Sequence, residues 1–172
     1  MIQKISAGQE VYCHKKPGVI GAVIRYHDKN CVLTVQHLLK VGGCVKGDKV
    51  TLNRWEGRVL EIWIDYDLAV IEVQAPSSQM DLSLLGQPEI GAAYTLHGQD
   101  KNHCQIMTLG KTYHYLAFAH TALPLPGDSG SPVIQKGKVV GILLSVFYNN
   151  AAGLAASLQD LPLNTKQEEV LR

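Results

Sequence analysis

Short β-branched runs separated by turn residues recur along the chain, and this pattern limits the possible folds more than any other feature. The run Val19–Ile24 is followed by the polar turn His27–Asn30 and then by the apolar run Cys31–Val35, which predicts a β-hairpin. Further strands are expected at residues 49–53, 57–64, 68–73, 92–96, 105–109, 113–119, 132–135, 139–147 and 153–156. The chain is therefore predicted to be all-β.

A polar stretch at Gln74–Gln79 carries no core pattern and divides the expected strands into two groups. Two such groups predict two six-stranded antiparallel β-barrels that pack face to face. We expect a single domain over residues 1–172, with an N-terminal barrel at 8–75, a linker at 76–90 and a C-terminal barrel at 91–157. Residues 158–172 are expected to form a short helical tail, because Asn164 or Thr165 can cap the helix-forming run that follows.

Composition and charge exclude several classes of partner. Hydrophobic residues make up 46% of the 172 residues and charged residues 18%, which suits a globular domain with a core. The formal net charge is +1 and no run of lysine and arginine is present, so neither nucleic acid nor a membrane is an expected partner. No apolar signal core follows Met1–Lys4, so the expected compartment is the cytoplasm of a cell or of an infected host.

The cysteines and histidines do not indicate a metal site. The four cysteines, which are Cys13, Cys31, Cys44 and Cys104, include no Cys-x-x-Cys pair, and the histidines show no metal-ligand spacing. We therefore expect no metal and no other cofactor. Two disulfides are possible, but free thiols are favoured because no export signal is visible. Cys31 lies in an apolar run, where a buried thiol would pack as a small hydrophobic side chain.

The segment Pro126–Val133 reads Pro-Gly-Asp-Ser-Gly-Ser-Pro-Val and surrounds Ser129 with small, turn-forming residues. Attack on a peptide carbonyl requires an exposed hydroxyl and backbone N–H groups that face the developing oxyanion. Gly127 has no Cβ and can adopt backbone angles that a larger residue resists. The N–H groups of Gly127 and Ser129 are thus the expected oxyanion donors. The alternative is an ordinary hairpin turn before a strand.

A serine nucleophile needs a base, and His37 has the most suitable position among the histidines. It follows the buried run Cys31–Val35, which would hold it rigidly at the edge of a cleft. A carboxylate must then orient the far imidazole nitrogen, and Asp65 and Asp67 are the two candidates. Asp67 is preferred because it directly precedes the buried run Leu68–Val73, and Asp65 would be its solvated neighbour.

Pro126–Val133 resembles the nucleophile motif of the trypsin-like serine peptidases, in particular compact bacterial and viral members such as the HtrA-like and glutamyl-endopeptidase-like proteins. The segment Leu33–Leu39 resembles the family's Thr-Ala-x-His segment, although two larger residues replace its small pair. Asp67–Val70 matches the pattern Asp-Leu-Ala-Val, and the resemblance covers about residues 8–157. The resemblance implies a catalytic triad in the order of the chymotrypsin class, made of His37, Asp67 and Ser129.

The resemblance also implies a primary substrate pocket. Its expected lining is Leu123, Leu144, Ser145, Val146 and Gly153. Leu123 would lie at the base, where a trypsin-like enzyme with a cationic preference carries an aspartate. The pocket is therefore expected to be apolar and to accept a medium hydrophobic or small residue before the scissile bond. His120 is more readily interpreted as a loop histidine than as a member of this pocket, and the other histidines are assigned no role.

The chain departs from the family in two respects. Secreted members carry a disulfide loop beside the catalytic histidine, and neither Cys31 nor Cys44 occupies that position. Members that mature by cleavage pair a new N-terminus with the aspartate before the serine. No matching Ile-Val-Gly-Gly start is present, so Asp128 is expected to accept hydrogen bonds locally.

Together these features predict a serine endopeptidase of narrow specificity that acts on a protein or peptide substrate through an acyl-enzyme. Polyprotein processing and regulated effector cleavage both fit such an enzyme. Its control would come from a regulatory partner, a fused domain or restricted substrate access. The alternative is a catalytically silent trypsin-like module that binds peptides or partner proteins.

Overall fold

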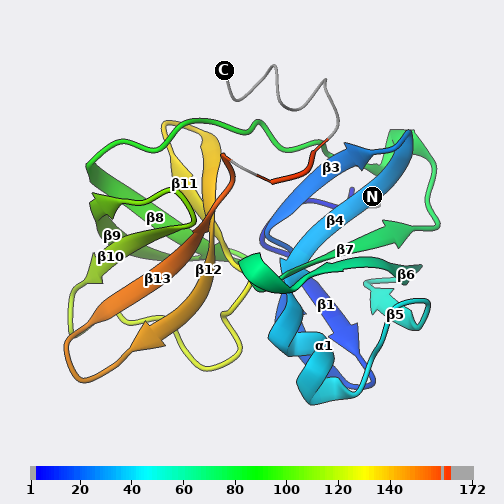
Figure 1. The fold of residues 1–172 in the computed structure, drawn as a ribbon, viewed down its shortest axis with the longest axis horizontal. Coiled ribbons are helices and arrows are strands. Elements are labelled where there is room, and N and C mark those ends of the chain that lie inside the picture. The colour runs from blue at the N-terminus through cyan, green and yellow to red at the C-terminus, as the bar shows by residue number, and fades with distance from the viewer. Residues whose placement is uncertain (1–2, 160, 164–172) are drawn as a thin grey trace.

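The computed structural model describes residues 3–159 and 161–163, and it consists of two β-rich units that lie side by side (Figure 1). The first unit contains β1 (Glu10–Cys13), β2 (Lys16–Val19), β3 (Ala22–Tyr26), β4 (Lys29–Val35), β5 (Lys49–Leu52), β6 (Trp55–Trp63) and β7 (Leu68–Val73). The second contains β8 (Gly91–His97), β9 (Asp100–Leu109), β10 (Tyr113–Phe118), β11 (Pro132–Gln135), β12 (Lys138–Phe147) and β13 (Ala152–Ser157). The all-β prediction is confirmed, and the helix expected after Asn164 lies outside the described residues.

The first unit is a curled sheet of seven strands in the order β2-β1-β5-β6-β7-β4-β3, not a closed six-stranded barrel. The expected strand Val19–Ile24 is divided between β2 and β3. Ile20 and Gly21 belong to neither strand, although the N–H of Ile20 still donates to the carbonyl of Gln9 at 2.8 Å. A Cβ at Gly21 would lie 2.8 Å from the carbonyl oxygen of Gly130. Glycine therefore lets this corner approach the second unit closely.

The second unit is a closed barrel of six antiparallel strands in the order β10-β13-β12-β11-β8-β9, as predicted. Residues 74–90 connect the two units and include η2 (Ser77–Gln79). This connection packs against both units, because Met80 forms a bridge with Ile5 and Leu85 forms one with Val139. Both Met80 and Leu85 are buried, which anchors the connection at two points.

The helix α1 (Gln36–Gly42) follows β4 immediately and was not predicted from the sequence. It buries Leu38 and Leu39 against the first unit and ends at Gly43, whose φ is 79°. A left-handed glycine at this position is a common helix ending. At seven residues the helix is too short for its periodicity to stand out from the strand pattern around it.

A disulfide joins Cys13 at the end of β1 to Cys44, which lies just beyond α1. The prediction of free thiols is therefore wrong for these two cysteines. It was based on the apparent compartment, whereas the pairing depends on the packing of α1 against β1, which brings the two Cα atoms to 6.3 Å. Cys31 and Cys104 are free, as predicted, and both are buried, which was expected for Cys31.

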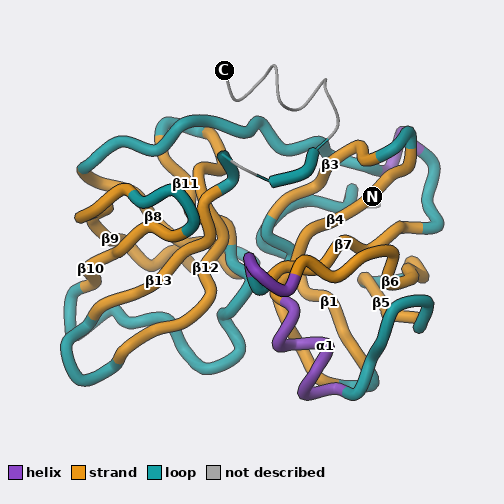
Figure 2. Tube along the Cα trace, in the orientation of Figure 1, coloured by secondary structure: helices purple, strands orange, loops and turns teal. Residues whose placement is uncertain are grey.

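The hydrophobic core continues across the junction of the two units. One cluster of buried side chains includes Leu33 and Leu68 from the first unit together with Ile142 and Leu144 from β12. The barrel has a second cluster of its own, to which Leu143 of the same strand contributes. Because β12 contributes to both clusters, it fixes the units against each other. In Figure 2, α1 and the short helix η1 (Ile64–Tyr66) lie close to this junction.

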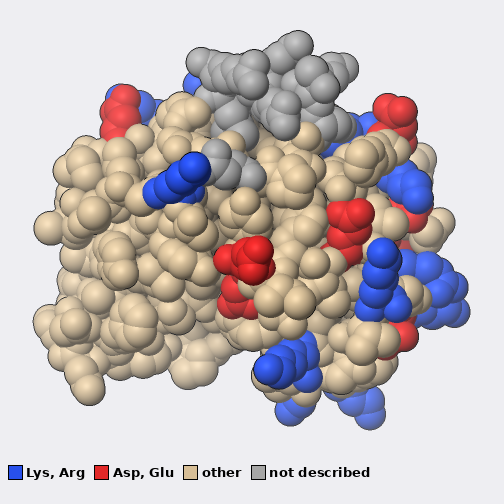
Figure 3. Space-filling view, in the orientation of Figure 1, with Lys and Arg blue, Asp and Glu red and all other residues tan. Residues whose placement is uncertain are grey.

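The face shown in Figure 3 carries its charged side chains unevenly. Acidic and basic groups gather over the first unit, and few lie over the barrel of β8–β13. Both signs occur together, in keeping with the formal net charge of +1. None of the helices in the described ranges has the length and apolar character that crossing a membrane requires.

Candidate active site

His37 and Asp67 are joined by two hydrogen bonds at the junction of the units. The ring Nδ1 of His37 lies 2.7 Å from Oδ2 of Asp67, and the backbone N–H of His37 donates to Oδ1 at 3.1 Å. A ring nitrogen that donates to a carboxylate leaves the other nitrogen as an acceptor in the neutral imidazole. The pair therefore orients His37 so that its Nε2 can take a proton.

Asp67 is held by the backbone that surrounds it. It follows η1 with φ at 54°, a left-handed conformation that aspartate adopts more readily than most residues. The N–H of Gln36 donates to its carbonyl at 2.9 Å, so the start of α1 is bonded both to the main chain and to the side chain of Asp67. Asp65 is exposed in η1, and its carbonyl accepts the Tyr113 hydroxyl at 3.2 Å. Of the two candidates, Asp67 is the one that contacts His37.

Ser129 lies in a turn whose backbone offers two unused donors. Within the described chain, neither the N–H of Gly127 nor that of Ser129 has a hydrogen-bond acceptor. Gly127 has φ at 97°, and a Cβ there would meet nothing within 4 Å, so glycine is required for its conformation and not for space. The Ser129 hydroxyl donates to the carbonyl of Leu144 at 3.2 Å.

The carboxylate of Asp128 closes the same turn. Its Oδ2 accepts the backbone N–H of Leu125 at 2.7 Å, and its own N–H donates to the carbonyl of Leu125 at 3.0 Å. This is the local hydrogen bonding expected for Asp128. Its Oδ1 lies 2.6 Å from Nδ1 of His97, a residue that was assigned no role from the sequence. Asp128 is only 8% exposed, so the two contacts satisfy a nearly buried carboxylate.

His37, Asp67 and Ser129 line one cleft of about 610 Å³ between the units. Three of the five residues predicted for substrate binding lie in its wall, namely Leu144, Ser145 and Val146. Leu123 packs against the barrel core and Gly153 is buried beside Phe118, and neither lines the cleft.

Pro126 of the nucleophile motif also lines the cleft. The sequence did not indicate the other residues of its wall, which are Tyr113, Leu125, Tyr148 and Leu154. The hydroxyl of Tyr148 donates to the carbonyl of Pro124 at 2.9 Å and so holds the loop before the nucleophile. Leu125 is 71% exposed, an unusual position for a large apolar side chain. Its place directly before Pro126–Val133 is the one signal that could have identified it as a cleft residue.

Among the described residues, one group of side chains lies close enough together to suggest metal ligands, formed by Cys13, His14 and Cys44. The two sulfur atoms are joined in the disulfide and do not provide thiolates. His14 is exposed, and its Nδ1 lies 2.9 Å from the carbonyl of Gly42. In the oxidised protein these three residues therefore do not offer a complete set of metal ligands.

Comparisons with known proteins identify the architecture. No family model and no curated protein sequence matches this chain. The structure is similar to that of Nocardiopsis protease (NAPase), with a TM-score of 0.70 and 11% identity over 90% of this chain and 92% of that one. It is also similar to Thermobifida fusca protease A, with a TM-score of 0.64 and 15% identity over 89% of this chain and 90% of that one. The chain has the trypsin-like serine-protease fold.

A third solved structure with this trypsin-like fold is a glutamic-acid-specific serine protease that uses a histidine triad in substrate binding. It aligns with a TM-score of 0.64 and 13% identity over 89% of this chain and 92% of that one. The resemblance drawn from the three sequence motifs is thus confirmed at the level of the fold. His37 and Ser129 come from different units of this fold and line the same cleft between them.

Proposed function

We propose that this chain is a serine endopeptidase that hydrolyses peptide bonds through an acyl-enzyme. The observation that carries the proposal is that one cleft contains the bonded pair His37 and Asp67, the hydroxyl of Ser129 and the unused N–H groups of Gly127 and Ser129. Acyl transfer requires a base, an orienting carboxylate, a nucleophile and an oxyanion site. A peptide-binding surface has no need of all four.

In this proposal, Ser129 Oγ attacks the scissile carbonyl carbon while His37 Nε2 takes its proton. The resulting oxyanion accepts hydrogen bonds from the N–H groups of Gly127 and Ser129. His37 then returns the proton to the leaving amine, the C–N bond breaks, and the acyl group remains on Ser129. A water molecule attacks this ester by the same route and releases the acid. Asp67 keeps its charge throughout and holds the Nδ1–H tautomer of His37.

The Ser129 hydroxyl must turn before it can react, because it donates to the carbonyl of Leu144 in the structure. A rotation about its χ1 moves Oγ from one staggered position to another, which is a fast side-chain motion. A substrate strand that pairs with the end of β12 would compete for the carbonyl of Leu144 and so favour the reactive rotamer. Substrate binding and activation of the nucleophile are thereby linked.

The apolar wall of the cleft supports a preference for an apolar side chain before the scissile bond. Leu144, Val146 and Leu154 contribute to this wall, and His37 is the one histidine among the described lining residues. Among the described lining residues there is no histidine besides His37 for binding a glutamate side chain, and no carboxylate besides Asp67 for binding a basic one. We therefore propose a medium hydrophobic or small residue at this position, within a narrow set of protein substrates.

A fluorophosphonate probe tests the proposal, because it phosphonylates only an activated serine. We expect the intact mass to rise by one adduct, with the label on Ser129 by peptide mapping. The variant Ser129→Ala should not be labelled, whereas Ser77→Ala, which removes an exposed serine in η2, should be labelled like the wild type. A peptide library would then give the cleavage preference.

The bond from Ser129 to the carbonyl of Leu144 also favours a second candidate function, a silent trypsin-like module that binds peptides in the same cleft. The two functions give opposite results in the labelling experiment. If the folded wild type stays unlabelled at every pH and peptide concentration tested but binds library peptides, the module is supported and the endopeptidase is rejected.

A further inference from the structure

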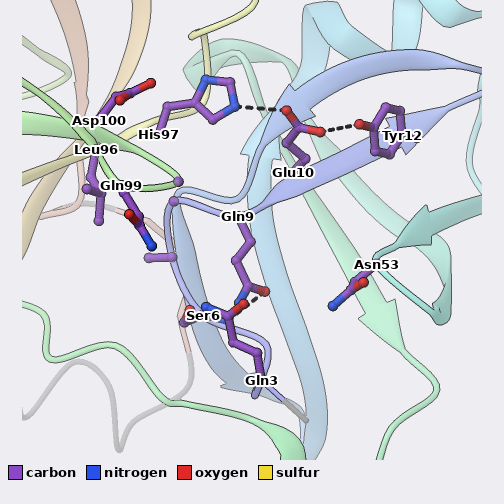
Figure 4. Close-up of a pocket in the computed structure, with 13 residues that line it drawn as sticks. Gln3, Ser6, Gln9, Glu10, Tyr12, Asn53, Leu96, His97, Gln99 and Asp100 are labelled. Atoms are coloured by element: carbon purple, nitrogen blue, oxygen red, sulfur yellow. Dashed lines mark hydrogen bonds and ion pairs between the residues drawn. The ribbon is translucent and has the colours of Figure 1, made fainter. Parts of the chain in front are cut away.

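A second cleft, of about 940 Å³, lies next to the N-terminal strand, and none of its lining residues lines the catalytic cleft (Figure 4). His97, at the end of β8, projects into it toward Glu10, at the start of β1. The imidazole Nε2 lies 3.1 Å from Oε1 of Glu10, and the opposite nitrogen contacts Asp128 at 2.6 Å. One histidine thus joins the first strand of the chain to the residue that precedes Ser129.

We propose that His97 is a positioning residue that holds the nucleophile turn through Asp128 and makes this hold depend on its own protonation and on Glu10. The proposal rests on the proposed peptidase function, which it deepens by adding a control point outside the catalytic cleft. His97 touches neither the substrate site nor the reacting atoms, because it lines only the second cleft. Its influence on Ser129 would be transmitted through Asp128 alone.

Both ring nitrogens of His97 face carboxylates, and an ionised carboxylate only accepts hydrogen bonds. An imidazolium has two N–H groups and can satisfy Glu10 and Asp128 together. A neutral imidazole has one N–H, so its other nitrogen would turn a lone pair toward a carboxylate oxygen. Loss of the proton therefore breaks one of the two links and leaves the nearly buried Asp128 with less positive charge beside it.

Asp128 connects His97 to the nucleophile turn. It bonds His97 with one oxygen and the N–H of Leu125 with the other, and Gly127 lies between Leu125 and Ser129 in the chain. A shift of this carboxylate therefore moves the two N–H groups that are proposed to bind the oxyanion. Such donors act by being held in place before the reaction, so a small displacement weakens them.

The charge of His97 is set by the carboxylates around it. Partial burial alone would lower its pKa, but the hydrogen bonds with Asp128 and Glu10 outweigh this effect and raise the pKa above the ordinary value of 6.5. The pKa of Glu10 is lowered, first by the hydrogen bond from Tyr12 and then by His97, so this carboxylate stays ionised. The titratable groups around the site are Glu10, Tyr12, Asp100, Asp128 and Tyr148.

The sign of the pH effect follows from these contacts. The hold on the turn is complete while His97 carries its proton, and it is weakened as the pH rises through the raised pKa of His97. The general base His37 acts in the opposite sense, because it must be neutral to accept a proton. The rate of Ser129 modification should therefore fall at alkaline pH as His97 loses its proton.

The test is the second-order rate of fluorophosphonate labelling from about pH 5 to 10, measured for the wild type, three test variants and one control variant. His97→Asn keeps a donor close to the Nδ1 position but cannot titrate, so its alkaline fall should disappear. His97→Gln shifts the donor toward the Glu10 side and should slow labelling at the optimum by roughly 10- to 100-fold, as expected for the loss of a hydrogen bond to a charged group. Glu10→Gln should move the alkaline fall to lower pH. The control His103→Asn, on the neighbouring strand β9, should behave as the wild type.

A second readout separates failure of this proposal from failure of the peptidase assignment. Side-chain NMR of the histidines and amide NMR of Gly127 and Ser129 follow the same titration without any catalysis. The proposal predicts that both amides shift with the pKa of His97 in the wild type and that Glu10→Gln shifts that pKa downward. The proposal is overturned if the amide chemical shifts of Gly127 and Ser129 do not change as His97 titrates. It is also overturned if His97→Asn shows the same loss of labelling rate at alkaline pH as the wild type. If the wild type is not labelled but its amide shifts follow the titration of His97, the peptidase function is rejected and the coupling between His97 and the nucleophile turn is retained.

Discussion

The carboxylate of Asp67 accepts two hydrogen bonds from His37, one from the ring at 2.7 Å and one from the backbone at 3.1 Å. This arrangement fixes the ring position and its tautomer with a single side chain. Since β4 and β7 are paired up to Val35 and Leu68, the two residues lie just beyond the ends of neighbouring strands. The pairing of these two strands therefore sets the geometry of the His37–Asp67 pair.

The substitution Asp67→Asn should leave the fold intact and lower kcat by roughly 10,000-fold, because the amide no longer selects the Nδ1–H tautomer of His37. The matched variant Asp65→Asn removes the neighbouring carboxylate, which is exposed and does not contact the ring, and should change kcat by no more than about twofold. Peptide hydrolysis at saturating substrate measures both. Equal losses in the two variants would show that the carboxylates act as a pair and that Asp67 has no special role.

The conformation of Gly127 allows a test of the proposed oxyanion site. Its φ is 97°, and a methyl group added to it would meet no neighbouring atom within 4 Å, so Gly127→Ala acts through backbone strain and not through a clash. We expect a loss of about 1–2 kcal/mol in stability and a fall in kcat of roughly 100- to 1,000-fold, since the N–H would turn away from the oxyanion.

Gly137→Ala is the matched control for Gly127→Ala. Gly137 lies in the turn between β11 and β12 with φ at 76°, and a Cβ there also meets nothing within 4 Å. It should lose similar stability by urea unfolding while keeping its kcat, because it does not line the catalytic cleft. A catalytic loss in Gly137→Ala as large as that in Gly127→Ala would assign both effects to general destabilisation.

The strand pattern of the sequence was sufficient to predict much of the fold. The apolar run at Leu68–Val73 and the β-branched run at Pro132–Gln135 both form strands with those bounds. In each case the pattern is local and the strand lies in the middle of a sheet. The division of Val19–Ile24 was not predictable in this way, because it depends on the close approach of Gly21 to Gly130, which lies in the other unit.

The same distinction applies to the candidate site. Ser129, His37 and Asp67 carry local motifs, and the structure gathers them around one cleft. His97 has no motif, because its partners Glu10 and Asp128 lie 87 and 31 positions away and meet only after both units have folded. Leu123 was placed by counting back from Ser129 on the family pattern, and Gly153 was expected at the far wall of the pocket. Leu123 packs against the barrel core and Gly153 lies buried in β13, so neither lines the cleft.

The disulfide between Cys13 and Cys44 should stabilise the helix that carries His37. It closes a loop of 31 positions, for which the chain-entropy relation gives about 3–4 kcal/mol. The double variant Cys13→Ala with Cys44→Ala should lose about this amount in urea unfolding, and a reducing agent should have no further effect on it. Reduction that leaves the wild type as stable as before would contradict this account.

The free cysteines provide an independent check on that pairing. Burial raises the pKa of both Cys31 and Cys104 to about 12, so neither forms a thiolate near neutral pH. Iodoacetamide should therefore leave the native protein unmodified and add two groups in urea without reductant, in line with the two free cysteines. Four added groups under those conditions would show that Cys13 and Cys44 are not joined.

His114 should make the protein sensitive to acid. It is 2% exposed on β10, its Nδ1 accepts the N–H of Gly110 at 3.2 Å, and its buried Nε2 has no partner among the described residues. Burial lowers the pKa of His114 below 6.5, so the unfolded chain takes up a proton at a higher pH than the folded protein does. The stability from the neutral ring is present above pH 6.5 and is lost progressively as the pH falls toward the lowered pKa.

The variant His114→Asn isolates this effect, because its amide oxygen can still accept the N–H of Gly110 but does not titrate. We expect the free energy of unfolding of the wild type to decrease on acidification by about 1.4 kcal/mol for each unit by which burial lowers the pKa. The variant should lack this part of the decrease, whereas the exposed control His103→Asn should retain it. Urea unfolding at a series of pH values measures all three, and parallel curves for the wild type and His114→Asn would exclude His114 as the source.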